Sequence, residues 1–242
     1  MGTWLINNAA DGFGIALTAE LLERGHAVAG IVRDEQQRRI YETCFAARPL
    51  CYLLPLHDTD ASRAVVDEIE AMGGEIEALV NNDDGHARRA LFDAASLDQV
   101  REHFERSVFG AVTLIQAVLP AMRRRRRGHV FNVTPLSAKG LWQGSESPMV
   151  SITETLDAEM ARHGVRATSV TLEHGGRHDA DARAAQAVLL ASVARHPPRR
   201  LLLGGRALRD MRRRIGEMQD ELSAWELVSL NSGRPTWQEA AG

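Results

Sequence analysis

Residues 3–17 read Thr-Trp-Leu-Ile-Asn-Asn-Ala-Ala-Asp-Gly-Phe-Gly-Ile-Ala-Leu: an apolar run, a polar turn with two glycines, and a second apolar run. The first run predicts a buried strand over Thr3–Ile6, and the second predicts a helix over about 13–24. Glycine at a strand-to-helix turn lets the backbone approach a pyrophosphate closely, and the helix N-terminus favours the negative charge of that group. This segment therefore indicates an α/β fold whose first turn can accept a dinucleotide.

The same alternation of short apolar runs and longer amphipathic stretches continues along the chain. Further strands are predicted over residues 27–32, 51–54, 76–80, 130–133, 167–171 and 201–203. Helices are predicted from about residue 34, over 61–72 with Asp60 as N-cap, and over 96–105, 108–123, 150–162, 180–195 and 206–224. Seven strands separated by helices predict an α/β fold: a doubly wound parallel seven-stranded sheet, Rossmann-like, with helices on both faces. We predict a single domain over residues 1–242 with a charged helical segment from about residue 206.

The composition excludes several classes of protein. The 242 residues carry a formal charge of −3, so there is no overall electrostatic case for nucleic acid or an anionic membrane as a partner. No apolar run approaches the length of a transmembrane helix, and the first residues lack the charged leader of a secretory signal. Two cysteines, Cys44 and Cys51, favour a reducing cytoplasm and are expected in the core. The run Arg123–Arg127 is expected to face solvent at a helix end, and no spacing of metal ligands is distinctive.

Several motifs, in the right order, resemble those of a known family. Asn7-Asn-Ala-Ala-Asp-Gly-Phe-Gly14 resembles the Thr-Gly-x-x-x-Gly-Ile-Gly turn of short-chain dehydrogenases/reductases, and Leu79-Val-Asn-Asn82 resembles their Asn-Asn-Ala-Gly motif. Ser107-Val-Phe-Gly110 stands where the family has Asn-Val-x-Gly. The resemblance covers nearly the whole chain and implies a nicotinamide dinucleotide as cofactor. It also implies a homodimer or homotetramer formed through the long helices near 100–125 and 150–162.

The chain departs from the residues that this family uses for catalysis. The resemblance implies a tyrosine as general acid and base, a lysine four residues later, a serine and an asparagine. Here Ser107 stands at the asparagine position and Pro135 at the serine position, with Thr134 and Ser137 as neighbours. No tyrosine can take the family's position, because both tyrosines of the chain come before the fourth predicted strand (Tyr41 and Tyr52).

The cofactor site implied by the resemblance is also altered. Asn8 replaces the first glycine of the turn, but asparagine tolerates left-handed backbone angles, so the turn can survive. Asp83 and Asp84 replace the alanine and glycine after the paired asparagines. Arg33 stands where NADP-preferring members of the family place a cation for the 2′-phosphate. Any cofactor is therefore expected to be NADP(H), and the residues expected to bind it are Asn8, Gly12, Phe13, Gly14, Arg33 and Asn81.

Ionisable and hydroxyl residues gather where the strands end, which is where sites form in sheets of this kind. The candidate catalytic residues are Asp83, Asp84, Ser107, Ser137, His174 and His178. Since carboxylates and imidazoles perform general acid–base work, the favoured hypothesis is a non-redox enzyme (a cyclase, dehydratase or isomerase) of a bacterial biosynthetic pathway. The short segment 173–181 after the sixth strand leaves room for a bulky small-molecule substrate or a partner. The alternatives are an NADPH-dependent ketoreductase that works without the tyrosine, and a catalytically silent subunit paired with an active paralogue.

Overall fold

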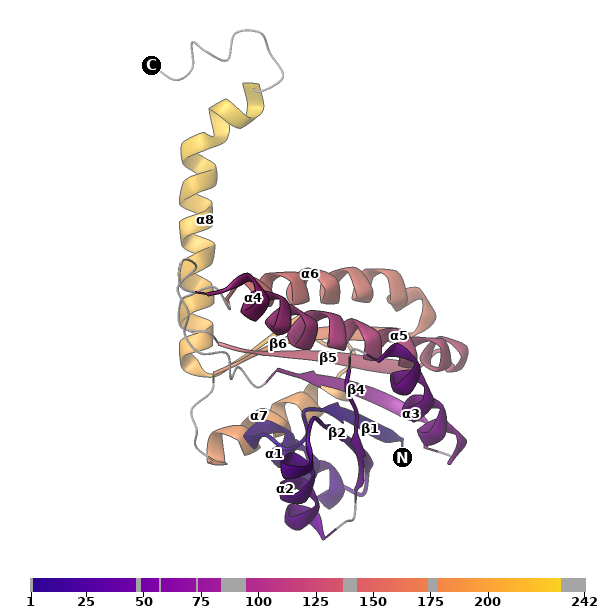
Figure 1. The fold of residues 1–242 in the computed structure, drawn as a ribbon. Helices are drawn as coiled ribbons and strands as arrows, with labels where there is room; N and C mark the ends of the chain where they lie inside the picture. The colour runs from indigo at the N-terminus through magenta and orange to yellow at the C-terminus, as the bar shows by residue number, and fades with distance from the viewer. Residues whose placement is uncertain are drawn as a thin grey trace. The chain divides into compact units, whose positions relative to one another are not determined.

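The computed structural model describes residues 2–46, 49–56, 58–72, 74–83, 95–136, 143–173 and 178–231, of which 143–147 and 178 by their backbone only. In these residues seven parallel strands form one sheet in the order β3-β2-β1-β4-β5-β6-β7 (Figure 1). The strands are β1 (Thr3–Asn7), β2 (Ala27–Val32), β3 (Leu50–Leu53), β4 (Ile76–Asn82), β5 (Gly128–Pro135), β6 (Val165–Leu172) and β7 (Arg200–Leu203). This order confirms the predicted doubly wound sheet, and its switch point lies between β1 and β4.

Helices cover both faces of the sheet (Figure 1). One face is covered by α1 (Gly12–Glu23), α2 (Glu35–Phe45) and α7 (His178–Ser192). The other face is covered by α3 (Thr59–Ala71), α5 (Gly110–Arg125) and α6 (Gln143–Met160). Two short turns complete this part of the chain: a π-helical turn, η1 (Glu105–Phe109), between α4 (Leu97–Phe104) and α5, and a 3₁₀ turn, η2 (Ala161–His163), after α6.

Alternate residues of each strand supply the two cores. In β1, Trp4 and Ile6 join the core beneath α1 and α7, whereas Leu5 joins the core beneath α3 and α5. In β5, Phe131 belongs to the first core and Val130 to the second, and the Phe131 ring stacks on Trp4 with ring centres 5.9 Å apart. The central strands are rich in apolar residues because both of their faces are buried.

The chain divides into two compact units, residues 1–203 and 204–242. The second unit begins at Gly204, whose φ of +111° is a conformation that glycine adopts without strain. It is described as one helix, α8 (Gly205–Asn231), of 27 residues. The start of α8 agrees with the helix predicted from about residue 206.

Two local predictions are wrong, the N-cap of α3 and the core placement of the cysteines. The N-cap of α3 is Asp58 rather than Asp60, because the backbone of Asp58 is extended and its carboxylate accepts a hydrogen bond from the Ala61 N–H at 2.9 Å. The two helices predicted over 96–105 and 108–123 are confirmed as α4 and α5, with η1 between them. Cys44 is exposed and Cys51 half-buried, because α2 is a polar helix of which Tyr41 is the buried residue.

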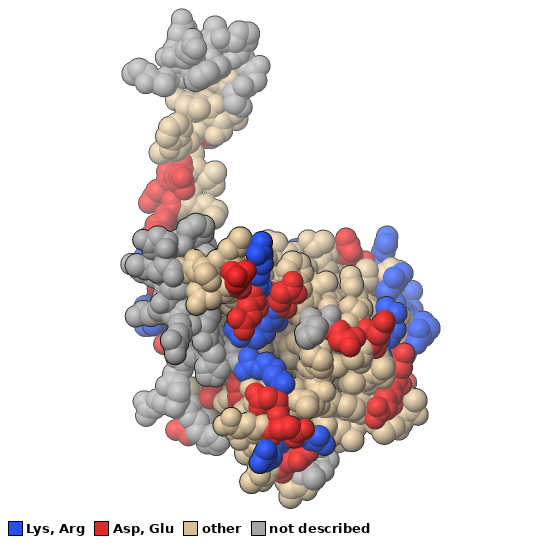
Figure 2. All heavy atoms as spheres, in the orientation of Figure 1, with Lys and Arg blue, Asp and Glu red and all other residues tan. Residues whose placement is uncertain are grey.

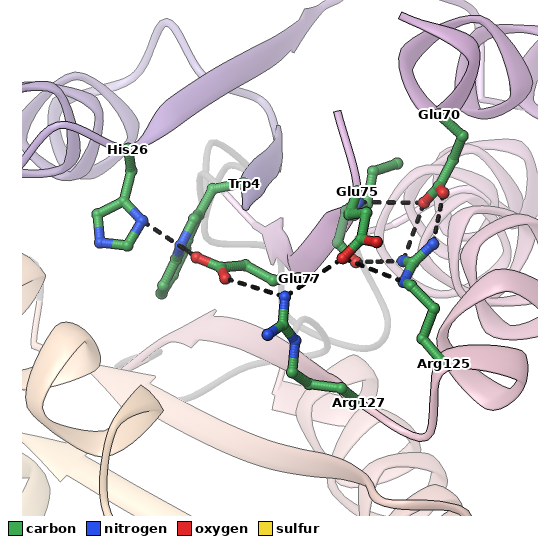
Figure 3. A network of polar contacts seen from close by, with 8 residues as sticks. Trp4, His26, Glu70, Glu75, Glu77, Arg125 and Arg127 are labelled. Atoms are coloured by element: carbon green, nitrogen blue, oxygen red, sulfur yellow. Dashed lines mark hydrogen bonds and ion pairs between the residues drawn. The ribbon is translucent and has the colours of Figure 1, made fainter. Parts of the chain in front are cut away.

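In the run Arg123–Arg127, Arg125 is the arginine that is partly buried and paired with another helix. Arg125 reaches back from the end of α5 and forms a two-pronged ion pair with Glu70 of α3, where it is only 20% exposed (Figure 3). Arg127 lies 3.4 Å from Glu75, just before β4. The other four arginines are exposed, as expected, and the expectation is corrected only at Arg125, which ties α3 to the end of α5.

Charges of both signs are interspersed over the face of residues 1–203 that Figure 2 shows. This mixture gives no broad field of one sign, as the formal charge of −3 also indicates. Among the residues described, no helix is both long enough and apolar enough to cross a membrane.

Candidate functional site

The turn between β1 and α1 keeps the backbone shape of a glycine-rich turn. Asn8 has φ +54°, a left-handed conformation that asparagine adopts more readily than most residues. Gly14 packs against the same turn, since a Cβ at this position would come within 2.8 Å of the Asn8 and Ala9 carbonyl oxygens. The prediction that the turn survives the replacement of its first glycine by Asn8 is confirmed.

Asp11 caps α1 and joins the turn to β4. Its Oδ1 accepts hydrogen bonds from the Gly14 N–H at 2.6 Å and from Asn82 Nδ2 at 2.7 Å. Asn82 Nδ2 also lies 3.3 Å from the Asn8 carbonyl oxygen, to which it donates. A carboxylate is stabilised at a helix N-terminus by the helix dipole. The negative charge of Asp11 therefore sits at the end of α1 that accepts dinucleotide phosphates in folds of this kind.

A chain of polar side chains links β4, β5 and α6 at the carboxyl ends of the strands. Asn81 Nδ2 donates to Asn132 Oδ1 at 2.8 Å, and Asn132 Nδ2 donates to Thr153 Oγ1 at 2.8 Å. Thr153 in turn donates to the Met149 carbonyl. The three linked side chains are at most 4% exposed, so these hydrogen bonds form in a low-dielectric surrounding and hold the amides in place.

The π-helical turn η1 brings further polar groups to the same place. Such a turn adds one residue to the helical repeat and so changes the face that its residues present. Ser107 is 8% exposed, and its Oγ lies 3.4 Å from Nδ1 of His103, one turn earlier. The neighbouring Arg106 has a buried Nε that makes no hydrogen bond with any described residue.

One cavity lies at the carboxyl ends of β1, β4 and β5, and it is bordered also by Arg33 after β2 and by Leu56 after β3. Of the polar residues described above, those that line it are Asn8, Asn81, Asn82, Arg106, Ser107 and Asn132. Five buried polar atoms on its wall have no hydrogen-bond partner in the described part of the chain: Asn8 Nδ2 and Oδ1, Asn81 Oδ1, Asn82 Oδ1 and Arg106 Nε. A buried polar atom without a partner costs about 1–3 kcal/mol. Their concentration here indicates a wall that is completed by a polar ligand.

The structure places five of the residues predicted from the sequence around this cavity: Asn8, Arg33, Asn81, Asp83 and Ser107. Gly12 and Gly14 shape the adjoining turn and do not line the cavity. Phe13 is fully buried in the core, so its side chain does not reach the cavity. The remaining predictions lie outside the described residues: Asp84, Ser137, His174 and the side chain of His178.

Sequence reasoning missed six residues at or beside the site: Asp11, Asn82, His103, Arg106, Asn132 and Thr153. Asn132 ends an apolar run in β5, which is a signal that could have placed it at the carboxyl edge of the sheet. Thr153 could not be identified from the sequence, because it is connected to the site only through its long-range hydrogen bond with Asn132. Arg106 carries no signal, because the π-helical turn that directs it inward leaves no mark in the hydrophobic pattern.

Neither tyrosine lines the cavity. Tyr41 is fully buried in α2, its hydroxyl lies 3.1 Å from Thr18 Oγ1, and burial raises its pKa. Tyr52 of β3 donates to Glu68 at 3.1 Å, and burial, aided by Glu68, raises the pKa of Tyr52 to about 12. Neither tyrosine is therefore placed to donate a proton to a ligand in this cavity. Burial also raises the pKa of the Cys51 thiol to about 11, which disfavours its thiolate form.

A doubly wound parallel sheet with a polar cavity at its switch point defines the Rossmann-like class of proteins. Within that class, this chain belongs to the short-chain dehydrogenase family, whose model ("short chain dehydrogenase") matches residues 3–174. It is similar to Oxidoreductase claN of Passalora fulva, with 28% identity over 170 residues that cover 68% of this chain and 78% of that protein. The next curated relatives are matched over less of their length, between 65% and 52%.

Solved structures agree with this assignment. A short-chain dehydrogenase from Streptomyces avermitilis superposes with a TM-score of 0.84 at 25% identity, covering 96% of this chain and 98% of that one. A metagenomic short-chain oxidoreductase in complex with NADP superposes with a TM-score of 0.72 at 21% identity, covering 84% of this chain and 96% of that one. At 21% identity, the similarity to the metagenomic oxidoreductase is evidence of a shared fold.

Proposed function

We propose that this protein is an NADP(H)-dependent oxidoreductase that reduces the carbonyl group of a small molecule without a tyrosine as proton donor. The observation that carries the proposal is the cavity wall of unpaired polar atoms beside the left-handed turn at Asn8. Such a wall suits an extended polar ligand, and Arg33 at its border suits the 2′-phosphate of NADP(H). Membership of the family and the NADP complex of a protein with the same fold support the same cofactor.

The chemical groups of the residues that line the cavity are suited to binding NADP(H). Asn8, Asn81 and Asn82 line the cavity and each has a buried amide atom without a hydrogen-bond partner among the described residues, and Arg33 and Arg106 offer cations for phosphate groups. Bound NADPH would supply a hydride to a carbonyl carbon. The carboxylate of Asp11 at the end of α1 works against the phosphates, so affinity rests on the amide and arginine groups.

The chain itself has to orient the substrate and protonate the oxygen that the hydride leaves negatively charged. Ser107 and Thr134 are the described residues whose hydroxyl groups line the cavity. We infer that the Ser107 hydroxyl gives its proton to the carbonyl oxygen and regains one from His103, whose Nδ1 lies 3.4 Å behind it. The product is then an alcohol, with the hydride on carbon and the proton on oxygen.

The non-redox hypothesis favoured by the sequence has less support. Of its acid–base residues, Asp83 lines the cavity, whereas Asp84, His174 and the His178 side chain lie outside the described residues. The relatives reported above are described as oxidoreductases or dehydrogenases. A catalytically silent subunit is the second candidate, favoured by the position of both tyrosines outside the cavity.

Calorimetric titration with NADPH and with NADH tests the proposal. We expect tighter binding of NADPH, and we expect Arg33→Ala to weaken NADPH binding about tenfold or more while NADH binding changes little. Arg39→Ala is the matched control, since Arg39 is exposed on α2 and does not line the cavity. Undetectable binding of both nucleotides contradicts the proposal.

Turnover separates the two candidates. NADPH oxidation is followed with a panel of aldehydes and ketones, and Ser107→Ala is expected to lower kcat by roughly 100-fold. Binding of NADPH without turnover of any carbonyl compound would favour the silent subunit instead.

A further inference from the structure

One side of α8 is a row of exposed apolar side chains. Six residues follow one another at spacings of three and four: Leu208, Met211, Ile215, Met218, Leu222 and Trp225. We call them the seam. A mean spacing of about 3.5 residues is the heptad repeat that lets two helices pair along one face. Met211 is half-buried, and the other five side chains are 42% to 66% exposed, which marks the seam as an interaction surface.

The charges of α8 are divided between its two halves. Residues 205–216 hold five arginines and one aspartate, a charge of +4, whereas residues 217–231 hold four carboxylates and no basic residue, a charge of −4. Figure 2 shows acidic side chains gathered on the second of these stretches. The helix dipole favours the opposite arrangement, with anions near the N-terminus and cations near the C-terminus. The isolated helix gains nothing from this distribution, but a partner of complementary charge does.

We propose that α8 pairs with α8 of a second copy of this chain as an antiparallel two-stranded coiled coil. Antiparallel pairing lays the arginine-rich half of each helix along the acidic half of the other, whereas parallel pairing sets like charges side by side. A pairing centred between Gly216 and Glu217 also aligns the whole seam. In that register the contacts with the second copy are Leu208 on Trp225, Met211 on Leu222, and Ile215 on Met218.

One ion pair distinguishes the two orientations. In the antiparallel register Arg214 lies beside Glu221 of the second copy, and the symmetry of the pair makes this contact twice. In a parallel pair Glu221 would instead lie beside Glu226 of the second copy. Arg213 is already engaged within the helix, by Asp210 and Glu217, whereas Arg214 and Glu221 form no ion pair within the residues described.

The seam is tested by the mass of the full-length chain in sedimentation velocity at about 50 µM. Ile215→Glu combined with Leu222→Glu is expected to halve the mass of the assembly, whether or not a second interface holds copies together. Ser223→Glu combined with Ala224→Glu is the control, because it adds the same charge on the side of α8 away from the seam. Overlapping near-ultraviolet circular dichroism spectra would show that both variants keep the folded core. A monomeric wild type, or an unchanged mass for the seam variant, overturns the proposal.

The orientation is tested by single charge reversals. Glu221→Arg and Arg214→Glu are each expected to weaken self-association roughly tenfold, and the two together are expected to restore it. Asp220→Arg makes the same charge change one residue away, on the outer side of the helix, and is expected to have little effect. Stronger association of Glu221→Arg would indicate a parallel pair and overturn the antiparallel arrangement. These measurements need no cofactor, so their outcome is independent of the proposed function.

Discussion

Replacing Asp11 by asparagine changes the charge at the end of α1 while keeping the oxygen that caps the helix, 2.6 Å from the Gly14 N–H. One negative charge at a helix N-terminus is worth about 0.3–1 kcal/mol when exposed and up to about 2 kcal/mol when partly buried. A phosphate bound at the same helix end also meets the charge of the half-buried Asp11 carboxylate, and two like charges about 10 Å apart repel each other by about 1–2 kcal/mol at an effective dielectric constant of about 20. This range corresponds to about 5- to 30-fold in Kd. We therefore expect Asp11→Asn to bind NADPH about 5- to 30-fold more tightly in calorimetric titration at constant salt.

Asp58→Asn is the control for this prediction. Asp58 caps α3 with the same geometry, 2.9 Å from the Ala61 N–H, and does not line the cavity, so its replacement should leave the Kd for NADPH unchanged. Both variants should stay within about 1 kcal/mol of the wild type in urea unfolding, because asparagine is as good an N-cap as aspartate. Unchanged or weaker NADPH binding by Asp11→Asn would refute the reasoning, since the carboxylate would then not compete with the phosphates.

Three further predictions concern stability. Burial, with a contribution from Arg166, lowers the pKa of His129 to about 4. The unfolded chain takes up a proton on this ring below about pH 6.5, and the folded chain only below about pH 4. The free energy of unfolding therefore decreases as the pH is lowered from about 6.5 to about 4. The loss from pH 7 to pH 5 should be about 2 kcal/mol in urea unfolding, and a loss that persists in His129→Gln would show that the ring is not its source. Gly14→Ala should cost about 1–3 kcal/mol because its Cβ meets backbone oxygens, and full stability of this variant would contradict the packing. Gly216→Ala adds a Cβ with nothing within 4 Å, so it should stabilise α8 by about 1 kcal/mol and raise helicity in far-ultraviolet circular dichroism; a loss of helicity would contradict this.

Much of the fold could be predicted because its signals are local. Each strand contains a short apolar run, so its position could be predicted from consecutive residues to within a few positions. The left-handed turn at Asn8 could be predicted for the same reason, since it depends on what asparagine tolerates. The N-cap of α3 could not be resolved between Asp58 and Asp60, because both residue types cap well and only the backbone angles distinguish them.

The site depended on contacts between distant residues. Asp11 meets Asn82, 71 residues away, and Asn81 meets Asn132, 51 residues away, so no local pattern could show that these side chains are hydrogen-bonded to one another. The inward turn of Arg106 comes from a π-helical irregularity that hydrophobic periodicity does not record.

The sequence by itself determined the doubly wound sheet, the glycine-dependent first turn and the charged helix from about residue 206, because each is a property of neighbours along the chain. Only the tertiary structure decided which polar atoms lack partners, where the two tyrosines lie, and that the seam of α8 is exposed. Burial and hydrogen bonding are settled by which distant segments meet, and that depends on the packing of the whole chain.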